Sequence, residues 1–306
     1  MSSSRMDIGR FITDDVYYRL LQIFPACAPA LGLCAQTASF ICVRSWRNRL
    51  IENAALALGP LSSRAERVRC AYAMLGSMQH LIADVLASQN FSAAQLCARV
   101  TQLDRTSEYH AARALGRGVI ITGIHMGAFE PALAILCQHE RRVHVLFQPD
   151  PMPRFEHARQ HMRQRLGVVE HHITNGVAAW GELLEALKAD EAVVLHGDFV
   201  LPGQRGVCMP FLGDSKVHLP SGPVRLSAAS GAPIIPTFCA RAANGFRVWS
   251  DGFILAPCEP VSAHEAAKHP AQLALVAAME RAIRAHPEQW MAFMNLKDFS
   301  GMRAQS

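Results

Sequence analysis

The pattern of hydrophobic positions divides the chain into a helical first third and a longer region of alternating strand-like and helical runs. Over residues 62–115, apolar side chains recur at helical spacing. Ser63 and Glu66 form a capping-box sequence at the start of this stretch, and Gly116 is a typical helix stop. We therefore expect helices throughout 62–115.

After residue 116, short β-branched runs alternate with helical periods. Strands are predicted at 119–124, 143–147, 168–169, 192–195, 234–238 and 246–249, and helices at 131–138, 154–166, 175–189, 221–231 and 263–285. Such alternation is typical of βαβ units. The predicted fold is α/β, with a mainly parallel central sheet flanked by helices. Residues 1–115 form an N-terminal helical, membrane-facing portion and residues 116–306 an α/β domain, together one continuous compact unit.

The segment 20–43 contains no charged residue, and Arg44, Arg47 and Arg49 follow it closely. Its length exceeds the roughly 20 residues that an apolar helix needs to span a bilayer. Two prolines near its start would interrupt a helix. Three interpretations stay open: helices lying on or dipping into a membrane, a buried hairpin, and a true span.

Composition narrows the class of protein. Of 306 residues, 50% are hydrophobic and 18% are charged, which argues against disorder, a coiled coil or a collagen-like repeat. The net charge of +5 comes mostly from arginines and favours anionic partners. The nine cysteines include no CxxC pair, so a reducing compartment is expected rather than a disulfide framework or a zinc ribbon.

The candidate chemistry lies where the first predicted strand ends. His125 follows the strand, Gly127 permits a turn, and Glu130 begins the next helix. Functional groups of parallel sheets gather at such strand ends. A carboxylate bonded to one imidazole nitrogen fixes the tautomer of the ring, so we expect Glu130 within hydrogen-bond reach of His125. The alternative is a structural histidine beside a glutamate stabilised by the helix dipole.

The sequence HMGAFE at 125–130 resembles the H-[FL]-G-N-W-E block of the bacterial lipid A biosynthesis lauroyl/myristoyl acyltransferases, within the lysophospholipid acyltransferase superfamily and its HX4D/E motif. Four further blocks resemble that family in order, at 148–167, 197–213, 221–238 and 286–290. Together they cover about 118–295. The family's Asn-Trp is Ala128-Phe129 here, and its Tyr-Arg-Pro arginine is Gln148, so an acceptor other than a lipid A precursor stays open.

The resemblance implies transfer of an acyl chain from a thioester, on acyl carrier protein or coenzyme A, to a hydroxyl or amine of a lipid or glycolipid. His125 would be the general base and Glu130 its orienting partner. Arg163, and next Arg159, would bind substrate and stabilise the oxyanion, and Asp198 would support the site or the acceptor. For these three residues a solvated surface charge is the alternative. No cofactor is expected beyond the thioester co-substrate.

The resemblance also implies a place at the cytoplasmic face of the bacterial inner membrane, peripheral or shallowly anchored. A narrow apolar tunnel for the acyl chain is expected beside His125, lined by Phe129, Leu133, Phe211 and the helix that starts at Ser221. Two rival functions stay open: an acyl-thioester hydrolase using water, and a catalytically idle lipid-binding protein.

Other site types have weaker support in the sequence. His157 and His161 have zinc-ligand spacing, yet no HExxH glutamate or third ligand accompanies them, so no metal is expected. GxSxG and Walker sequences are absent, and the few scattered Tyr and Trp residues do not indicate nucleic-acid binding.

Overall fold

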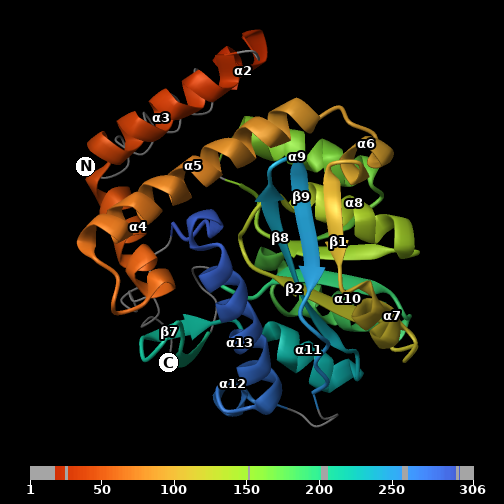
Figure 1. Cartoon of the computed structure of the whole chain (residues 1–306). Helices are drawn as coiled ribbons and strands as arrows, with labels where there is room; N and C mark the ends of the chain where they lie inside the picture. Colours follow the sequence, from red (N-terminus) through yellow and green to blue (C-terminus); the bar gives the residue numbers. More distant parts are fainter. Residues whose placement is uncertain are drawn as a thin grey trace.

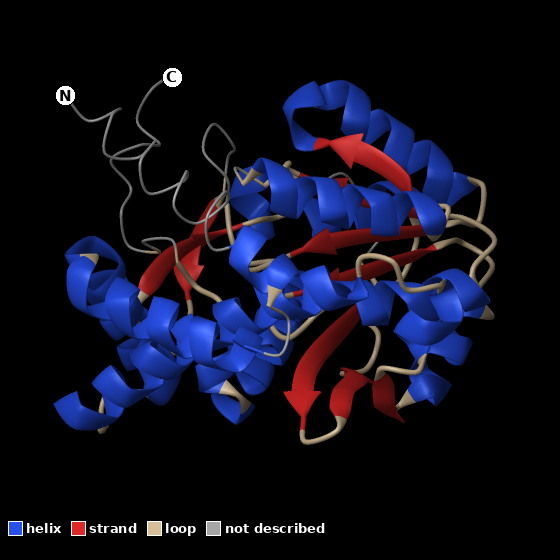
Figure 2. Cartoon of the chain, turned by 90° about the horizontal axis from the view of Figure 1, so that it is seen from above, coloured by secondary structure: helices blue, strands red, loops and turns tan. Residues whose placement is uncertain are grey.

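A computed structural model of the chain shows one seven-stranded sheet between helical layers (Figure 1, Figure 2). The structure describes residues 18–24, 27–150, 152–200, 206–256, 261–293 and 296. The sheet has the strand order β1-β9-β8-β2-β5-β3-β4. Its strands are β1 (Val100–Asp104), β2 (Val119–Gly123), β3 (Val143–Phe147), β4 (Val169–His172), β5 (Ala192–His196), β8 (Ile234–Ala242) and β9 (Gly245–Ser250).

Most neighbouring strands run parallel. The pairs β2–β5, β2–β8, β3–β4, β3–β5 and β1–β9 are parallel, and β8–β9 is antiparallel. A separate antiparallel pair consists of β6 (Val207–Pro210) and β7 (Lys216–Leu219). The predicted α/β class with a mainly parallel central sheet is therefore confirmed.

Helices cover both faces of the sheet. The helices are α2 (Tyr18–Ile23), α3 (Ala28–Cys42), α4 (Arg44–Leu58), α5 (Arg64–Ser88), α6 (Ala93–Cys97), α7 (Thr106–Arg113), α8 (Phe129–His139), α9 (Pro153–Arg165), α10 (Val177–Lys188), α11 (Gly222–Ser230), α12 (Ala263–Ala266) and α13 (Pro270–Ala285). On one face, Leu133 of α8 packs with Ile121 and Val145 of the strands. On the other, Leu183 of α10 packs in the same cluster as Ile120.

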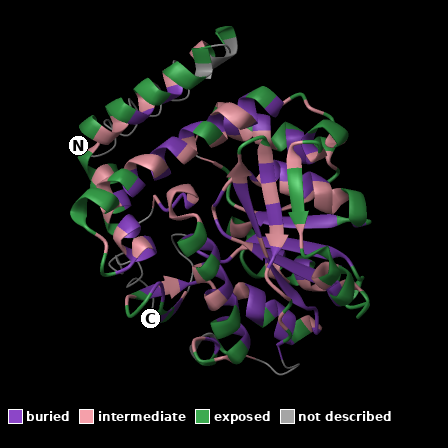
Figure 3. Cartoon of the chain, viewed as in Figure 1, coloured by how far each residue is buried: buried purple, intermediate pink, exposed green. Residues whose placement is uncertain are grey.

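Alternation along each strand explains these two cores, because successive side chains point to opposite faces of a sheet. β2 and β5 are buried over nearly their whole length, as expected for parallel strands with both faces covered. Figure 3 shows the buried residues concentrated on these central elements, with exposed residues on the outer helices.

The N-terminal portion packs onto the body through α5. Ile82 and Val85 of α5 share a cluster with Phe155 and Met162 of α9. Helix α3 lies along the outside of α5 and is separate from the sheet (Figure 1). Among the described residues, no helix combines the length and the apolar character needed to cross a bilayer. Residues 1–17, which belong to the predicted N-terminal portion, lie outside the described part.

Three sequence expectations need correction. Residues 100–104 were expected to be helical but form β1, whose VTQLD run pairs with β9. The β6–β7 hairpin was not predicted, because its strands have only four residues each. The expected helix 263–285 is broken before Pro270, whose ring is compatible with a helix start but not a helix interior. The sheet thus crosses residue 115, and the division into an N-terminal helical portion and an α/β domain that together form one continuous compact unit stays a prediction.

Candidate active site

Strand register brings His125 and Asp198 together. β2 and β5 are neighbours in the sheet, and Gly123 pairs with His196 at their carboxyl ends. His125 and Asp198 each lie two residues beyond that pair. The side chains therefore meet at the same edge of the sheet, where the connections after parallel strands form ligand sites.

Asp198 is completely buried and accepts three hydrogen bonds. Its Oδ1 lies 2.8 Å from His125 Nδ1. Its Oδ2 accepts from the His125 backbone N–H at 3.0 Å and from Trp290 Nε1 at 3.1 Å. Burial alone would raise the Asp198 pKa, but the charge and hydrogen bonds of His125 outweigh it and hold the pKa below its ordinary value. Asp198 is therefore an ionised carboxylate that orients His125.

The His125 ring remains accessible, with 42% of the side chain exposed. It stacks with the ring of His196 at 4.2 Å and with that of Phe199 at 4.7 Å, measured between ring centroids. Burial, and then the charge of His125, lower the His196 pKa to about 3. His196 is accordingly a neutral neighbour, and Nε2 of His125 is the ring nitrogen left for substrate.

The loop that carries His125 is fixed on both sides. Gly127 adopts φ +64°, and a Cβ there would lie 2.3 Å from the carbonyl oxygen of Cys239, so glycine is required. The backbone N–H of Met291 donates to the His125 carbonyl at 2.8 Å, and Met126 bridges to Trp290. The C-terminal Trp290 segment thus holds both His125 and its carboxylate partner.

The expected hydrogen bond between Glu130 and His125 is not formed. Glu130 is buried in the first turn of α8, and its Oε1 accepts from Arg159 Nε at 2.6 Å, while Oε2 is buried without a hydrogen-bond partner. On α8 the Glu130 side chain points toward α9. Asp198 follows β5, the strand next to β2, and its side chain reaches His125. Burial disfavours the Arg159 cation, yet the Glu130 carboxylate raises the Arg159 pKa above its ordinary value. The charged Arg159 lines the same cavity as His125.

Arg163 is held in a different network. Its Nε donates to Glu170 at 2.6 Å and its Nη2 to Glu156, and its guanidinium lies over the Phe147 ring. The side chain is only 3% exposed. The alternative of a solvated surface charge is therefore wrong for Arg159 and Arg163, which are paired with carboxylates inside the molecule.

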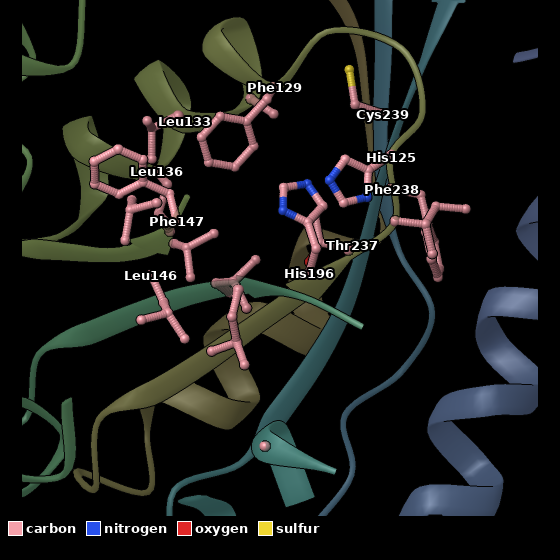
Figure 4. Close-up of a pocket in the computed structure, with 18 of the residues that line it drawn as sticks. His125, Phe129, Leu133, Leu136, Leu146, Phe147, His196, Thr237, Phe238 and Cys239 are labelled. Carbon is pink, nitrogen blue, oxygen red and sulfur yellow. The ribbon is translucent and has the colours of Figure 1, made fainter. Parts of the chain in front are cut away.

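A cavity of about 1090 Å³ opens beside His125. Figure 4 shows the rings of His125 and His196 side by side, with Phe129, Leu133 and Phe147 gathered to one side of them. Phe129, Leu133 and residues of α11 line the cavity as expected. Phe211 does not line it; this side chain is fully buried and packs edge-on against Trp290.

The residues that line the cavity form two parts, which belong to different packing clusters on the two faces of the sheet. We call the first the inner arm; it lies between the sheet and helices α7 and α8 and is lined by Tyr109, Leu133, Leu136, Val145 and Val194. We call the second the outer arm; it lies along α10 and α11 and is lined by Val177, Trp180, Gly181, Leu184, Gly222, Arg225, Leu226 and Ala229.

Sequence reasoning missed the roles of His196, Phe199 and Trp290. His196 and Phe199 flank the Gly197-Asp198 pair, and a strand-end histidine beside an acidic residue was the available signal. Trp290 lay inside a recognised block, but nothing local indicates that its indole reaches Asp198, 92 residues away in sequence. His157 and His161 approach each other at 3.1 Å, and within the described residues no His, Cys, Asp and Glu set could hold a metal ion.

Comparison with known proteins gives one family. A search of curated proteins finds none that matches this chain. The family profile described as bacterial lipid A biosynthesis acyltransferase matches residues 16–297, which is nearly the whole chain and includes His125, Glu130 and Trp290. The chain therefore belongs to the bacterial lipid A biosynthesis acyltransferase family and is an enzyme that transfers acyl groups.

Proposed function

We propose that this enzyme moves a fatty acyl chain from an acyl thioester to a hydroxyl or amine of a lipid or glycolipid, with His125 as general base. One observation carries the proposal: an accessible imidazole, held by a buried carboxylate, opens into a large apolar cavity. A base oriented in this way is suited to deprotonating a nucleophile.

The transfer step needs no covalent enzyme intermediate. His125 Nδ1–H donates to Asp198, so Nε2 accepts the proton of the acceptor O–H as its oxygen attacks the thioester carbonyl. The new C–O bond forms, the C–S bond of the tetrahedral intermediate breaks, and the imidazolium returns the proton to the departing thiolate. The ionised Asp198 stabilises the imidazolium while it exists.

The oxyanion of that intermediate needs a hydrogen-bond donor. Arg159 reaches the cavity wall with its Nε fixed by Glu130, which leaves its terminal N–H groups for the substrate. Arg163 has both Nε and Nη2 committed to carboxylates. We therefore assign the oxyanion to Arg159, with Glu130 as the residue that positions it, and assign Arg163 to the structure of the cavity wall.

The inner arm suits the donor acyl chain. It is lined mainly by buried aliphatic side chains, including Leu133 and Val194. Each buried CH₂ contributes about 0.8 kcal/mol, so a closed apolar arm favours long chains over short ones. The length of the arm would then set the preferred donor.

Helix α3 suits a membrane surface. Leu33 and Ile41 are 56% and 65% exposed on a helix without charged residues, and Arg44 begins the next helix. An exposed apolar face beside basic residues favours binding to anionic lipid. We propose peripheral or shallow attachment at the cytoplasmic face of the inner membrane, with acyl carrier protein or acyl-CoA supplying the chain.

The reaction type is tested by supplying labelled acyl thioester with and without a lipid acceptor and following both products by mass spectrometry. Acyl transfer with little free fatty acid supports the proposal. Free fatty acid at the same rate with and without acceptor would identify a thioester hydrolase instead, and no turnover of any donor would identify a lipid-binding protein.

The assignment of the inner arm is tested by Leu133→Trp. The larger ring should shorten the arm, lowering turnover of long-chain donors by about 4- to 15-fold while short-chain turnover is kept, in line with the loss of one or two buried CH₂ groups. A donor-chain series in the transfer assay measures this. An unchanged chain profile would place the acyl chain elsewhere, and equal loss at all lengths would indicate misfolding.

Membrane attachment is tested by flotation with vesicles that contain anionic lipid. Replacing both Leu33 and Ile41 with Glu should move the protein from the vesicle fraction to the unbound fraction. Leu273→Glu on α13, which is 49% exposed, is the matched control and should leave flotation unchanged. Equal flotation of both variants would contradict a role for α3.

A further inference from the structure

The outer arm leads away from the active site along two helices. Val177, Trp180, Gly181 and Leu184 form one stripe of α10, and Gly222, Arg225, Leu226 and Ala229 form one stripe of α11. Both sets have the i, i+3, i+4, i+7 spacing of a single helix face, which spans about 10 Å. α10 precedes β5 and α11 precedes β8, so both helices begin at the carboxyl edge of the sheet.

The outer arm differs from the inner arm in exposure and charge. Val177 is 89% exposed, and Gly181, Arg225 and Ala229 are also exposed, so this arm is open along its side. Trp180 lies across it against Gly222, where a Cβ would come within 2.4 Å of the indole. Arg225 is the single charged residue of the outer-arm stripes, and it has no ion-pair partner within the described residues.

An acyl thioester is a linear molecule with its reacting carbonyl between two long arms. If the fatty chain fills the inner arm, the remainder of the donor must leave the active site by another path. Phe199, which stacks on His125, lines the same cavity, and the exposed residues of the outer arm open the cavity to solvent. It lies on the side of the molecule away from α3, the helix assigned to the lipid surface (Figure 1).

We propose that the outer arm binds the 4′-phosphopantetheine arm of the acyl donor, with Arg225 contacting its phosphate. The inference rests on the proposed function and specifies the donor subsite within it. An unpaired guanidinium matches a phosphate in charge and geometry. The apolar stripes match the methylene and dimethyl groups of the pantetheine. The soluble donor and the lipid acceptor then reach His125 from different sides.

Acyl carrier protein and coenzyme A share this phosphopantetheine group, so the test uses three donors: acyl carrier protein, acyl-CoA, and the acyl thioester of N-acetylcysteamine, which lacks the phosphate. Arg225→Glu should raise KM for the first two by about tenfold or more and leave kcat/KM for the truncated donor unchanged. Arg117→Glu, at an exposed arginine before β2, is the matched control and should behave as wild type.

A second variant tests the path without changing charge. A Cβ at Gly181 would meet no atom within 4 Å, so Gly181→Phe adds a ring to a residue of the outer-arm lining whose Cβ causes no clash. It should raise KM for the phosphopantetheine donors and leave the truncated donor unaffected, while Gly181→Ala should resemble wild type.

The outcomes separate this inference from the proposed function. A KM increase with both donors shows that the shared phosphopantetheine group is bound. An increase with acyl carrier protein alone would place Arg225 against the carrier protein and overturn the phosphate contact. Wild-type KM values in both variants, or equal losses with the truncated donor, would overturn the inference while transfer itself stands. Absence of turnover by wild type with every donor would instead overturn the proposed function.

Discussion

Two histidine–carboxylate pairs in this molecule have similar distances and different surroundings. His125 Nδ1 lies 2.8 Å from Asp198, and His144 Nε2 lies 2.7 Å from Glu191. The His125 ring is 42% exposed, whereas that of His144 is 8% exposed. The second nitrogen of His144 is also occupied, at 2.9 Å from His171 Nε2.

The difference lies in the second ring nitrogen. His144 belongs to a closed series in which His171 Nδ1 in turn meets Glu182 at 2.7 Å. Burial lowers the His144 pKa, and His171 lowers it further, while Glu191 opposes both effects. With both nitrogens committed, His144 can only hold β3, β4 and β5 together. His125 keeps one nitrogen directed to a cavity, and a carboxylate partner alone therefore does not identify a catalytic histidine.

The largest expected effect is on acyl-transfer activity, which should depend on His125 and not on His144. His125→Ala should lower acyl transfer by about 10²- to 10⁴-fold at a temperature where the variant is folded, because a general base contributes about that much. The comparison variant His144→Ala, assayed at a temperature where it is folded, should keep nearly full kcat/KM. Similar turnover by both variants would contradict the assignment of His125 as catalytic and His144 as structural.

The second prediction concerns the folding stability that His144 contributes. His144→Gln should lower the free energy of unfolding by about 1–3 kcal/mol, since it leaves buried hydrogen-bonding groups without their partners. Urea denaturation followed by circular dichroism measures this. Glu182→Gln, at the 61% exposed end of the same series, is the control and should cost less. A larger loss from Glu182 than from His144 would contradict the assignment.

A smaller effect concerns pH and His196. Its pKa falls from an ordinary 6.5 to about 3 in the folded protein. Below about pH 6.5 the unfolded chain therefore binds a proton that the folded chain does not, and stability falls as pH is lowered toward 3. His196→Gln should flatten this decline without abolishing it, since His144 contributes in the same direction. Equal slopes for wild type and variant between pH 7 and 5 would contradict a half-buried His196 that stays neutral in the folded protein.

Local patterns predicted most of the fold but only part of the site. β3 was predicted at its observed residues, and α8, α9 and α10 were placed within two residues or so, because their periodicity and stop signals are local. β1 was missed because a five-residue strand between helices has little pattern of its own.

The partner of His125 could not be derived from spacing along the chain. Glu130 is five residues from His125, but α8 points it toward Arg159. Asp198 is 73 residues away, and only the parallel register of β2 and β5 brings it to the imidazole. The family resemblance selected His125, Glu130, Arg159, Arg163 and Asp198 as a set, and side-chain packing then determined which of them meet.

The central claim is that Asp198 acts through His125 and Glu130 acts through Arg159. Single-turnover transfer rates of Asp198→Asn and Glu130→Gln, each measured alone and in the His125→Ala background, test it most directly. The account predicts that Asp198→Asn lowers the rate by about 10²-fold alone and by less than about twofold after His125→Ala. Glu130→Gln should cost the same in both backgrounds. An Asp198→Asn loss that persists undiminished without His125, or a Glu130→Gln loss that disappears, would contradict the account.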